Sequence, residues 1–331
     1  MKSDGSFILE NLIAPISAEL AQVEEGLLAE ADSGLSFIHS MNRYVHNSGG
    51  KRLRPALLLT VSRMMGGDRE VALKLGVIVE YLHAATLVHD DVIDGSEMRR
   101  GRSSLNALHQ NKEAVLFGDW LYMTSFWNAL ELKDFRFLQT LIRITRQMVE
   151  GELLQMEMTF NPEISAEIRE RISFCKTAGL FGCCCQLGAQ SAGADPEVEE
   201  GFARYGEYLG MSFQLVDDML DYTAREEALG KPVLKDLDEG NITLPMIYLI
   251  EEATDEERIF IQEAIRSGNK NKQVKTRINS LIRQYGCLDR TAGKAEAYAG
   301  KAMETLADLP LSQKDMGLLQ ELPGWILGRS Y

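Results

Sequence analysis

The residues with the clearest capacity for chemistry are two aspartate clusters of identical spacing. "HDDVID" supplies Asp90, Asp91 and Asp94, and "VDDMLD" supplies Asp217, Asp218 and Asp221. In a helix, residues four apart lie on one face with their side chains about 5 to 6 Å apart. Two carboxylates so placed repel each other unless a cation lies between them. Each cluster therefore predicts a site for a divalent metal ion.

The choice of ligands indicates which metal and which substrate. Carboxylate oxygens, completed by water and phosphate, suit Mg²⁺ better than zinc or a caged calcium ion. If the two clusters face each other across one cavity, they gather about three Mg²⁺ ions, enough to bind a strongly anionic group. A diphosphate has the charge and the oxygen atoms to bridge such ions, and basic side chains can hold its remaining oxygens.

Basic residues accompany both clusters. Arg99 and Arg100 follow the first, and "GGKRLRP" places Lys51, Arg52 and Arg54 before an apolar helix, with glycines that let backbone approach a ligand. This stretch lacks the spacing of a P-loop. Further cations lie in or beside apolar or loop-like segments, namely Lys176, with Thr177 next to it in "CKTAG", and Lys231 in "GKP".

The elements that must position these residues are helices. Apolar residues recur three and four positions apart, as in the series Leu75, Ile78, Val79, Leu82, which is the helical period. The 331 residues contain no linker rich in Pro, Gly or Ser and no repeat. We expect a single all-α domain over residues 1–331, a helical bundle in which the two aspartate helices face each other.

Charge and hydropathy exclude several classes of protein. A net charge of −14 argues against binding DNA or RNA through a basic surface. The polar start of the chain lacks the layout of a signal peptide, and we find no apolar run of about 18 residues, so we expect a cytoplasmic protein without a transmembrane segment. Cys183, Cys184 and Cys185 are consecutive and are expected to be small buried helix residues rather than a disulfide or metal set.

The motifs together resemble those of trans-isoprenyl diphosphate synthases of the long-chain, polyprenyl type. Over nearly the whole chain the resemblance includes, in order, "GGKRLRP", "HAATLVHDDVID", "RRG", "KTA", "FQLVDDMLD", "GKP" and "TLP". It implies an all-helical homodimer that joins isopentenyl diphosphate to an allylic diphosphate such as farnesyl diphosphate. It also implies dependence on Mg²⁺, and transient membrane contact when the product is released.

The resemblance also implies roles for individual residues. Asp90, Asp94 and Asp217 would be the main Mg²⁺ ligands, with Asp91, Asp218 and Asp221 as further ligands or supports. The allylic diphosphate would be held by Arg99, Lys176, Thr177, Gln214 and Lys231, and isopentenyl diphosphate by Lys51, Arg54, His83 and Arg100. One departure from the family pattern is Asn241 in "EGNITLP", where many shorter-chain members have lysine.

Product length is expected to depend on residues that precede the first cluster. Ala85 and Thr86 stand where short-chain relatives often carry bulky aromatics, so a tunnel is expected to run past them and Leu82. Since each isoprene unit needs roughly one helical turn, about 5 Å, we expect a product of about seven to ten units, with about eight as the single value. Candidates for the tunnel floor are Met123, Phe126 and Trp127.

Four alternatives remain at this stage. A shorter-chain farnesyl or geranylgeranyl diphosphate synthase would share both clusters. A class I terpene cyclase would need only one DDxxD motif and no "GGKRLRP". A di-iron bundle would need two Glu-x-x-His motifs, of which only Glu80 and His83 supply one. A non-catalytic subunit of a heteromeric synthase would have lost acidic ligands, and turnover by the isolated chain separates it from an enzyme.

Overall fold

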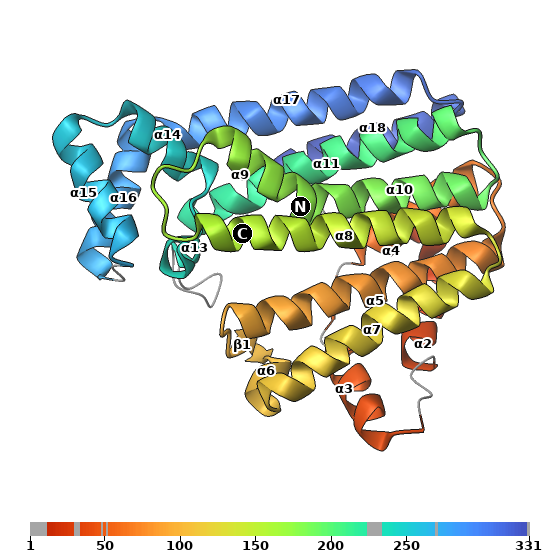
Figure 1. Ribbon diagram of the computed structural model, residues 1–331. Coiled ribbons are helices and arrows are strands. Elements are labelled where there is room, and N and C mark those ends of the chain that lie inside the picture. Colours follow the sequence, from red (N-terminus) through yellow and green to blue (C-terminus); the bar gives the residue numbers. More distant parts are fainter. Residues whose placement is uncertain are drawn as a thin grey trace.

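The computed structural model of the chain describes residues 12–29, 34–47, 49–50, 52–223, 234–268 and 271–329. The expectation of an all-α fold is confirmed: the described strands form one short hairpin, β1 (Met98–Arg99) with β2 (Arg102–Ser103), and the other elements are helical (Figure 1). The helices of the N-terminal half are η1 (Ala14–Ile16), α2 (Ser17–Ala29), α3 (Ser36–His46), α4 (Leu53–Met64), α5 (Arg69–Ile93), α6 (Leu105–Leu108), α7 (Asn111–Glu131) and α8 (Phe135–Met158).

The C-terminal half continues the bundle. Its helices are α9 (Ala166–Ser173), the π-helical turn η2 (Phe174–Ala178), α10 (Gly179–Ser191), α11 (Pro196–Thr223), α13 (Lys235–Glu239), α14 (Leu244–Glu252), α15 (Asp255–Arg266), α16 (Lys272–Gln284), α17 (Cys287–Ala307) and α18 (Gln313–Leu327). In Figure 1 the short helices α13 to α16 gather at one end of the long ones.

Helix α5 carries the first aspartate cluster at its C-terminal end. It begins where the Asp68 carboxylate accepts hydrogen bonds from the backbone N–H groups of Glu70 and Val71, which satisfies donors that a helix start leaves without partners. It ends at the expected place, because Gly95 adopts the left-handed conformation (φ 61°). By length and composition alone, α5 is apolar enough to span a membrane. However, 67% of its most apolar window is buried in the protein, as in a core helix.

Helix α11 carries the second cluster and packs closely against α10. A Cβ atom at Gly206 or Gly210 would lie 2.5 to 2.6 Å from backbone atoms of Phe181 or Ala178, so only glycine permits this approach. Cys183, Cys184 and Cys185 of α10 are buried and form no disulfide, as expected. This close packing fixes α11 within the bundle, with its C-terminal end beside α13 (Figure 1).

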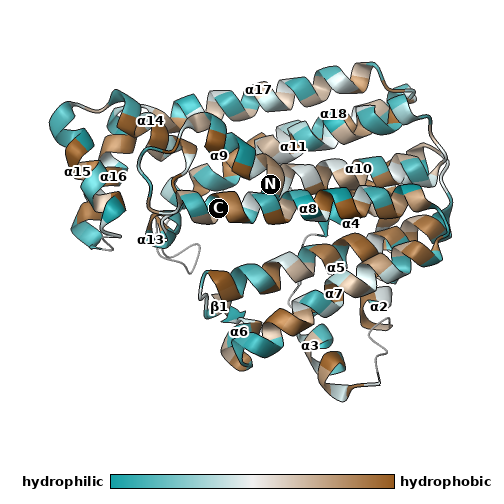
Figure 2. Ribbon diagram, in the orientation of Figure 1, coloured by the Kyte–Doolittle hydropathy of each residue, from teal (hydrophilic) through white to brown (hydrophobic). Residues whose placement is uncertain are grey.

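Helices α7 and α8 expose many large apolar side chains, in contrast to the fully packed α10. Among the described residues, those more than a third exposed on these two helices are Val115, Leu116, Met123, Trp127, Leu130, Phe135, Ile142, Val149, Leu153 and Met156. Figure 2 shows the corresponding apolar segments on α7 and α8. An exposed apolar area of this extent on a soluble domain indicates an interaction surface.

Candidate active site

A polar cavity of about 190 Å³ brings residues of the two aspartate clusters together. Asp94 at the end of α5 lies on one side, and Asp217 and Asp218 of α11 lie on another. The cavity is completed by polar residues from α8, α9, η2, α11, α13 and the segment before α14, chiefly Gln155, Arg169, Ser173, Lys176, Thr177, Gln214, Asp236 and Asn241. The two motifs therefore flank one space, as the sequence predicted from their spacing.

The three aspartates of the first cluster point in different directions. Asp90 is half-buried and lines an apolar cavity, whereas Asp94 caps α5 and its backbone N–H donates to the Asp90 carbonyl over 2.8 Å. Asp91 is buried and accepts two hydrogen bonds from Nε of Arg99, at 2.9 and 2.7 Å. Arg99 is thereby held at the basic cavity described below, and the structure does not bring it to the polar cavity where the sequence predicted it.

The second cluster is divided in the same way. The Asp217 carboxylate is half exposed and pairs with Arg329, the residue that follows α18 by two positions, at 3.2 Å. Asp218 is buried and pairs with Arg169 at 2.9 Å. Asp221 accepts hydrogen bonds from the N–H groups that begin α13, at 3.0 and 3.2 Å. In each motif the second aspartate is therefore neutralised inside the protein, and Asp221 supports α13.

The electrostatics of Asp90 favour a bound cation. The pKa of this carboxyl is raised from 3.8 to about 7, chiefly by burial and also by the nearby carboxylates of Glu152 and Asp94, although Lys176 acts to lower it. The carboxylates of α5 also lie at the negative end of the helix dipole. Among the described residues, however, no three acidic, histidine or cysteine side chains converge closely enough to hold a metal unaided. This open arrangement fits Mg²⁺, which binds one or two carboxylates and takes its other oxygens from water and phosphate.

Lys176 and Thr177 lie on the π-helical turn η2, a feature that is frequent at functional sites. Lys176 forms an ion pair with Glu152 at 2.5 Å and donates to Gln155 at 3.0 Å, both on α8. Thr177 donates to the side-chain oxygen of Gln214 over 2.6 Å. Three of the residues predicted to hold an allylic diphosphate thus lie together, while Lys231 falls outside the described residues.

A second, basic cavity lies on the other side of α5. It is small, about 70 Å³, and its lining includes Arg52, His83, Arg99, Arg100 and Arg102. Arg54 lies next to it and donates to Nε2 of His83 over 3.0 Å, so that this nitrogen accepts. Burial, and then the charge of Arg54, lower the pKa of His83, which keeps the ring neutral. Lys51 falls outside the described residues.

Arg52 and Arg100 of the basic cavity have different roles. Arg52 forms an ion pair with the buried Glu80 at 2.6 Å and donates to the carbonyl of His46. Glu80 therefore serves a structural ion pair, not a di-iron site. Arg100 donates to the carbonyl of Gly49 and is exposed, so it is free to turn toward an anion in the cavity.

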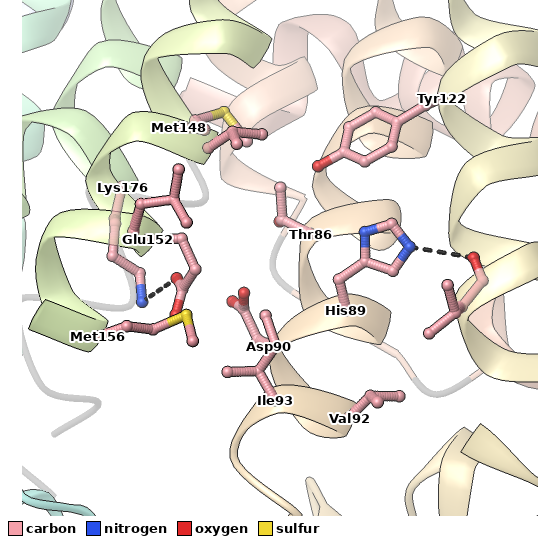
Figure 3. A pocket seen from close by; sticks show the side chains of 13 residues that line it. Thr86, His89, Asp90, Val92, Ile93, Tyr122, Met148, Glu152, Met156 and Lys176 are labelled. Carbon is pink, nitrogen blue, oxygen red and sulfur yellow. Dashed lines mark hydrogen bonds and ion pairs between the residues drawn. The ribbon is translucent and has the colours of Figure 1, made fainter. Parts of the chain in front are cut away.

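The apolar cavity beside Asp90 has a volume of about 330 Å³. Figure 3 shows Asp90, Lys176 and Glu152 near one another, with Thr86, Tyr122 and Met148 toward the far end. The remaining lining residues are mostly apolar side chains of α5, α7 and α8, including Val92, Ile93, Val115, Val149, Leu153 and Met156. Lys176 lines both this cavity and the polar one, so a ligand can place its charged head in one and an apolar tail in the other.

The residues predicted to set product length are not all placed along this cavity. Thr86 lines it, but Ala85 and Leu82 are fully buried in the core and do not. On α7, Trp127 is 63% exposed and donates to Glu131 of its own helix, so it faces outward. Phe126 packs against the core, and Met123 is exposed; neither lines the cavity. The α5 face that reaches the cavity is offset by one residue from the predicted one.

Several site residues were missed from the sequence. Glu152, Arg169, Tyr122 and Arg329 are single residues outside any motif, and each reaches the site from a different helix or helix end. Helical spacing could have identified Glu152, because Gln155 and Glu152 are three positions apart and face the same lysine. Nothing local identifies the other three, since their partners are distant in sequence.

The chain is similar to proteins of one family along almost its whole length. The family profile described as "Polyprenyl synthetase" matches residues 36–282. Octaprenyl diphosphate synthase of Escherichia coli is 35% identical over 91% of this chain and 93% of its own. Component 2 of the heptaprenyl diphosphate synthase of Geobacillus stearothermophilus is 34% identical over 98% and 99%.

Solved structures agree with these sequence relatives. A polyprenyl synthase from Caulobacter crescentus, in complex with calcium and isoprenyl diphosphate, has a TM-score of 0.91 and 34% identity, and covers 97% of this chain and 98% of its own. A decaprenyl diphosphate synthase from Rhodobacter capsulatus has a TM-score of 0.90 and 31% identity, with 96% and 98% covered.

Proposed function

Because this chain belongs to the polyprenyl synthetase family and is a prenyltransferase, we propose that it is a Mg²⁺-dependent long-chain polyprenyl diphosphate synthase. It joins isopentenyl diphosphate head to tail onto an allylic diphosphate, with farnesyl diphosphate as a suitable primer. The observation that carries this proposal is the position of Lys176 between a polar cavity flanked by both aspartate clusters and an apolar cavity. An allylic diphosphate has a charged head that suits the polar cavity and an isoprenoid tail that suits the apolar cavity.

The allylic diphosphate and isopentenyl diphosphate are proposed to bind at two sites that differ in their chemistry. Asp90, Asp94 and Asp217 hold the metal ions, and Lys176, Thr177 and Gln214 hold the allylic diphosphate beside them. Bound Mg²⁺ supplies the positive charge that stabilises a departing diphosphate. Isopentenyl diphosphate keeps its diphosphate, and it is bound by the basic residues alone: Lys51, Arg54, His83 and Arg100.

The reaction needs no protein nucleophile. As the allylic carbon–oxygen bond breaks, the double bond of isopentenyl diphosphate attacks that carbon, and the departing diphosphate accepts the proton that is then lost. The protein's part is to align the reacting carbons and keep water from the allylic cation. The apolar wall formed by Met148, Leu153 and Met156 suits the second task.

The product is proposed to contain about eight isoprene units. This length follows from the number of turns of α5 that precede Asp90, with about one turn for each unit. The names of the relatives, which specify octaprenyl, heptaprenyl and decaprenyl products, support a long chain. The far end of the cavity is bounded by Tyr122 and Met148. A chain that grows to this length has to pass them, so these two side chains are the proposed determinants of length.

We also propose that the protein is a cytoplasmic homodimer formed through α7 and α8, whose exposed apolar side chains support this arrangement. Light scattering coupled to gel filtration measures the mass directly. Trp127→Glu on α7 is expected to shift the dimer toward monomer, while Ile259→Glu, an equally exposed apolar position on α15, is the control.

One incubation tests the main proposal. Purified protein is mixed with farnesyl diphosphate, labelled isopentenyl diphosphate and Mg²⁺, and the dephosphorylated products are sized. Products of about seven to ten units support it. Labelled products that stop at geranylgeranyl length would show a shorter-chain synthase, and no incorporation of label would contradict a catalytic role for the isolated chain.

A further inference from the structure

The α3 corner, which we define as residues 34–47 and 98–112, differs in charge from the rest of the molecule. It contains five Arg or Lys residues and no Asp or Glu, although the whole chain has a net charge of −14. The two segments lie against each other: Tyr44 donates to the carbonyl of Ser103 over 2.7 Å, and Phe37 and His109 have ring centroids 5.2 Å apart. Arg99 is paired with the buried Asp91, and the exposed charged residues of the corner, Arg43, Arg100, Arg102 and Lys112, are all basic on an otherwise acidic protein.

A cavity of about 480 Å³ opens on this corner, between α3 and β2. It is lined by hydrogen-bond donors and positive side chains, namely Ser36, His39, Ser40, Arg43, Tyr44, Asn47 and Arg102. Arg43 and Arg102 are exposed, and neither forms an ion pair with any described residue. Arg102 lies over the Tyr44 ring at 4.7 Å and donates to the carbonyl of Asn47 over 3.3 Å, so its charge is not neutralised by these contacts. Guanidinium groups without a carboxylate partner around a cavity suit a phosphate group.

Exposed apolar side chains surround the same corner. Leu108 is 50% exposed, Met98 57% and Phe37 42%. Figure 2 shows α3 with both hydrophobic and hydrophilic residues on its surface. Basic residues combined with exposed large apolar ones on a short amphipathic element are typical of surfaces that lie in the headgroup region of a bilayer.

We propose that the α3 corner docks on an anionic phospholipid bilayer, with a lipid phosphate in the cavity between α3 and β2. Charge complementarity selects this partner, because the clustered basic residues attract an anionic surface that the rest of the chain repels. The proposal rests on the proposed function, whose long product is a lipid that has to enter a membrane.

The α3 corner lies next to the basic cavity that is proposed to bind isopentenyl diphosphate. Tyr44 and Arg102 line both the corner cavity and the basic cavity beside α5. Docking therefore places a diphosphate-binding part of the enzyme next to the membrane surface.

Vesicle flotation tests the surface. The full-length protein is mixed with phosphatidylcholine vesicles that contain about one-third phosphatidylglycerol, or none, and bound protein is measured. We expect binding to the anionic vesicles, release by high salt, and little binding to the neutral ones. Arg43→Glu with Lys112→Glu is expected to reduce partitioning about tenfold or more, because two attractive charges become repulsive.

Matched variants separate the corner from general effects of charge and hydropathy. Lys314→Glu on α18 reverses one charge at another exposed site and is compared with Arg43→Glu alone, and Ile259→Ser is compared with Leu108→Ser alone. Only the corner variants are expected to lose vesicle binding, with circular dichroism and turnover in detergent like the wild type. Equal loss in Lys314→Glu, or no binding by the wild type, would overturn the proposal.

Two further arms distinguish the source of the phosphate and the role of the product. Inorganic diphosphate is expected to leave vesicle binding largely intact; complete displacement would mean that the cavity takes a soluble anion and would overturn the bilayer assignment. Product length is measured separately in detergent. Long products without vesicle binding overturn the docking surface alone, whereas short products with vesicle binding overturn the proposed length and support the surface.

Discussion

The two aspartate motifs have identical spacing but different surroundings. In both, the second aspartate is buried and paired with an arginine, Asp91 with Arg99 and Asp218 with Arg169. The first motif ends its helix and faces an apolar cavity, whereas the second lies within α11 and uses Asp221 to hold the start of α13. Spacing alone therefore identifies the face proposed to bind metal, and the neighbouring residues determine which carboxylates are paired and which face a cavity.

The largest expected effect is the loss of catalysis when either motif loses its leading carboxylate. Asp90→Ala and Asp217→Ala are each expected to lower kcat/KM at least about 10⁴-fold, because the leaving diphosphate loses a metal ion. Circular dichroism is expected to remain unchanged. Asp289→Ala, at an exposed position of α17, is the control. Near-normal turnover in one of the two variants would show that only the other motif binds essential metal.

The ion pairs of Asp218 and Asp91 are expected to contribute differently to the free energy of unfolding. Asp218→Ala leaves Arg169 buried without its partner and is expected to lower the free energy of unfolding by about 3 to 5 kcal/mol. Asp91→Ala is expected to cost about 1 kcal/mol, because the Arg99 side chain is 36% exposed and can turn to water. Urea denaturation measures both. Equal losses would contradict this difference, and Arg169→Met added to Asp218→Ala is expected to recover part of the larger one.

The environment of the first motif also predicts a pH dependence in metal-free protein. Burial raises the pKa of Asp90 to about 7, so between about pH 4 and 7 the folded state binds more protons than the unfolded state. The free energy of unfolding from this group therefore falls as the pH rises through that window. In EDTA, the stability of Asp90→Asn relative to wild type is expected to increase from about pH 5 to 8. A constant difference across this range would contradict the raised pKa.

The smallest expected effect concerns two adjacent residues, Ala85 and Thr86, which precede the first motif. Thr86 lines the apolar cavity and Ala85 does not, so Thr86→Phe is expected to shorten the products while the first condensation continues. Ala85→Phe inserts a ring into the packed core and is expected to cost about 1 to 3 kcal/mol of stability. Product sizing and thermal unfolding are measured for both variants. Shorter products from Ala85→Phe with unchanged stability would restore the tunnel path predicted from the sequence.

The helical fold and the meeting of the two motifs could be predicted because both depend on local patterns. A period of three and four residues indicates a helix, and a repeated DDxxD indicates a common ligand. Thr177 and Gln214, both predicted to hold the allylic diphosphate, form a hydrogen bond with each other. The offset between Ala85 and Thr86 could not be predicted, because one residue rotates a helix face by about 100°, and only packing sets that rotation. Arg169 and Arg329 were missed because their partners come from distant segments.

The π-helical turn of residues 174–178 has a consequence for insertions and deletions in this family. Residues 166–191 run as one rod of three successive segments, α9, η2 and α10. The turn itself carries Lys176, which lines the two cavities, and Gly188 near the end of α10 packs against α4, where a Cβ would lie 2.6 Å from the Leu58 carbonyl. A π turn accommodates one extra residue in a helix. Losing a residue there would return the rod to regular geometry and shift one end against the other by about 100°. The turn therefore allows Lys176 to reach the cavities while Gly188 packs against α4.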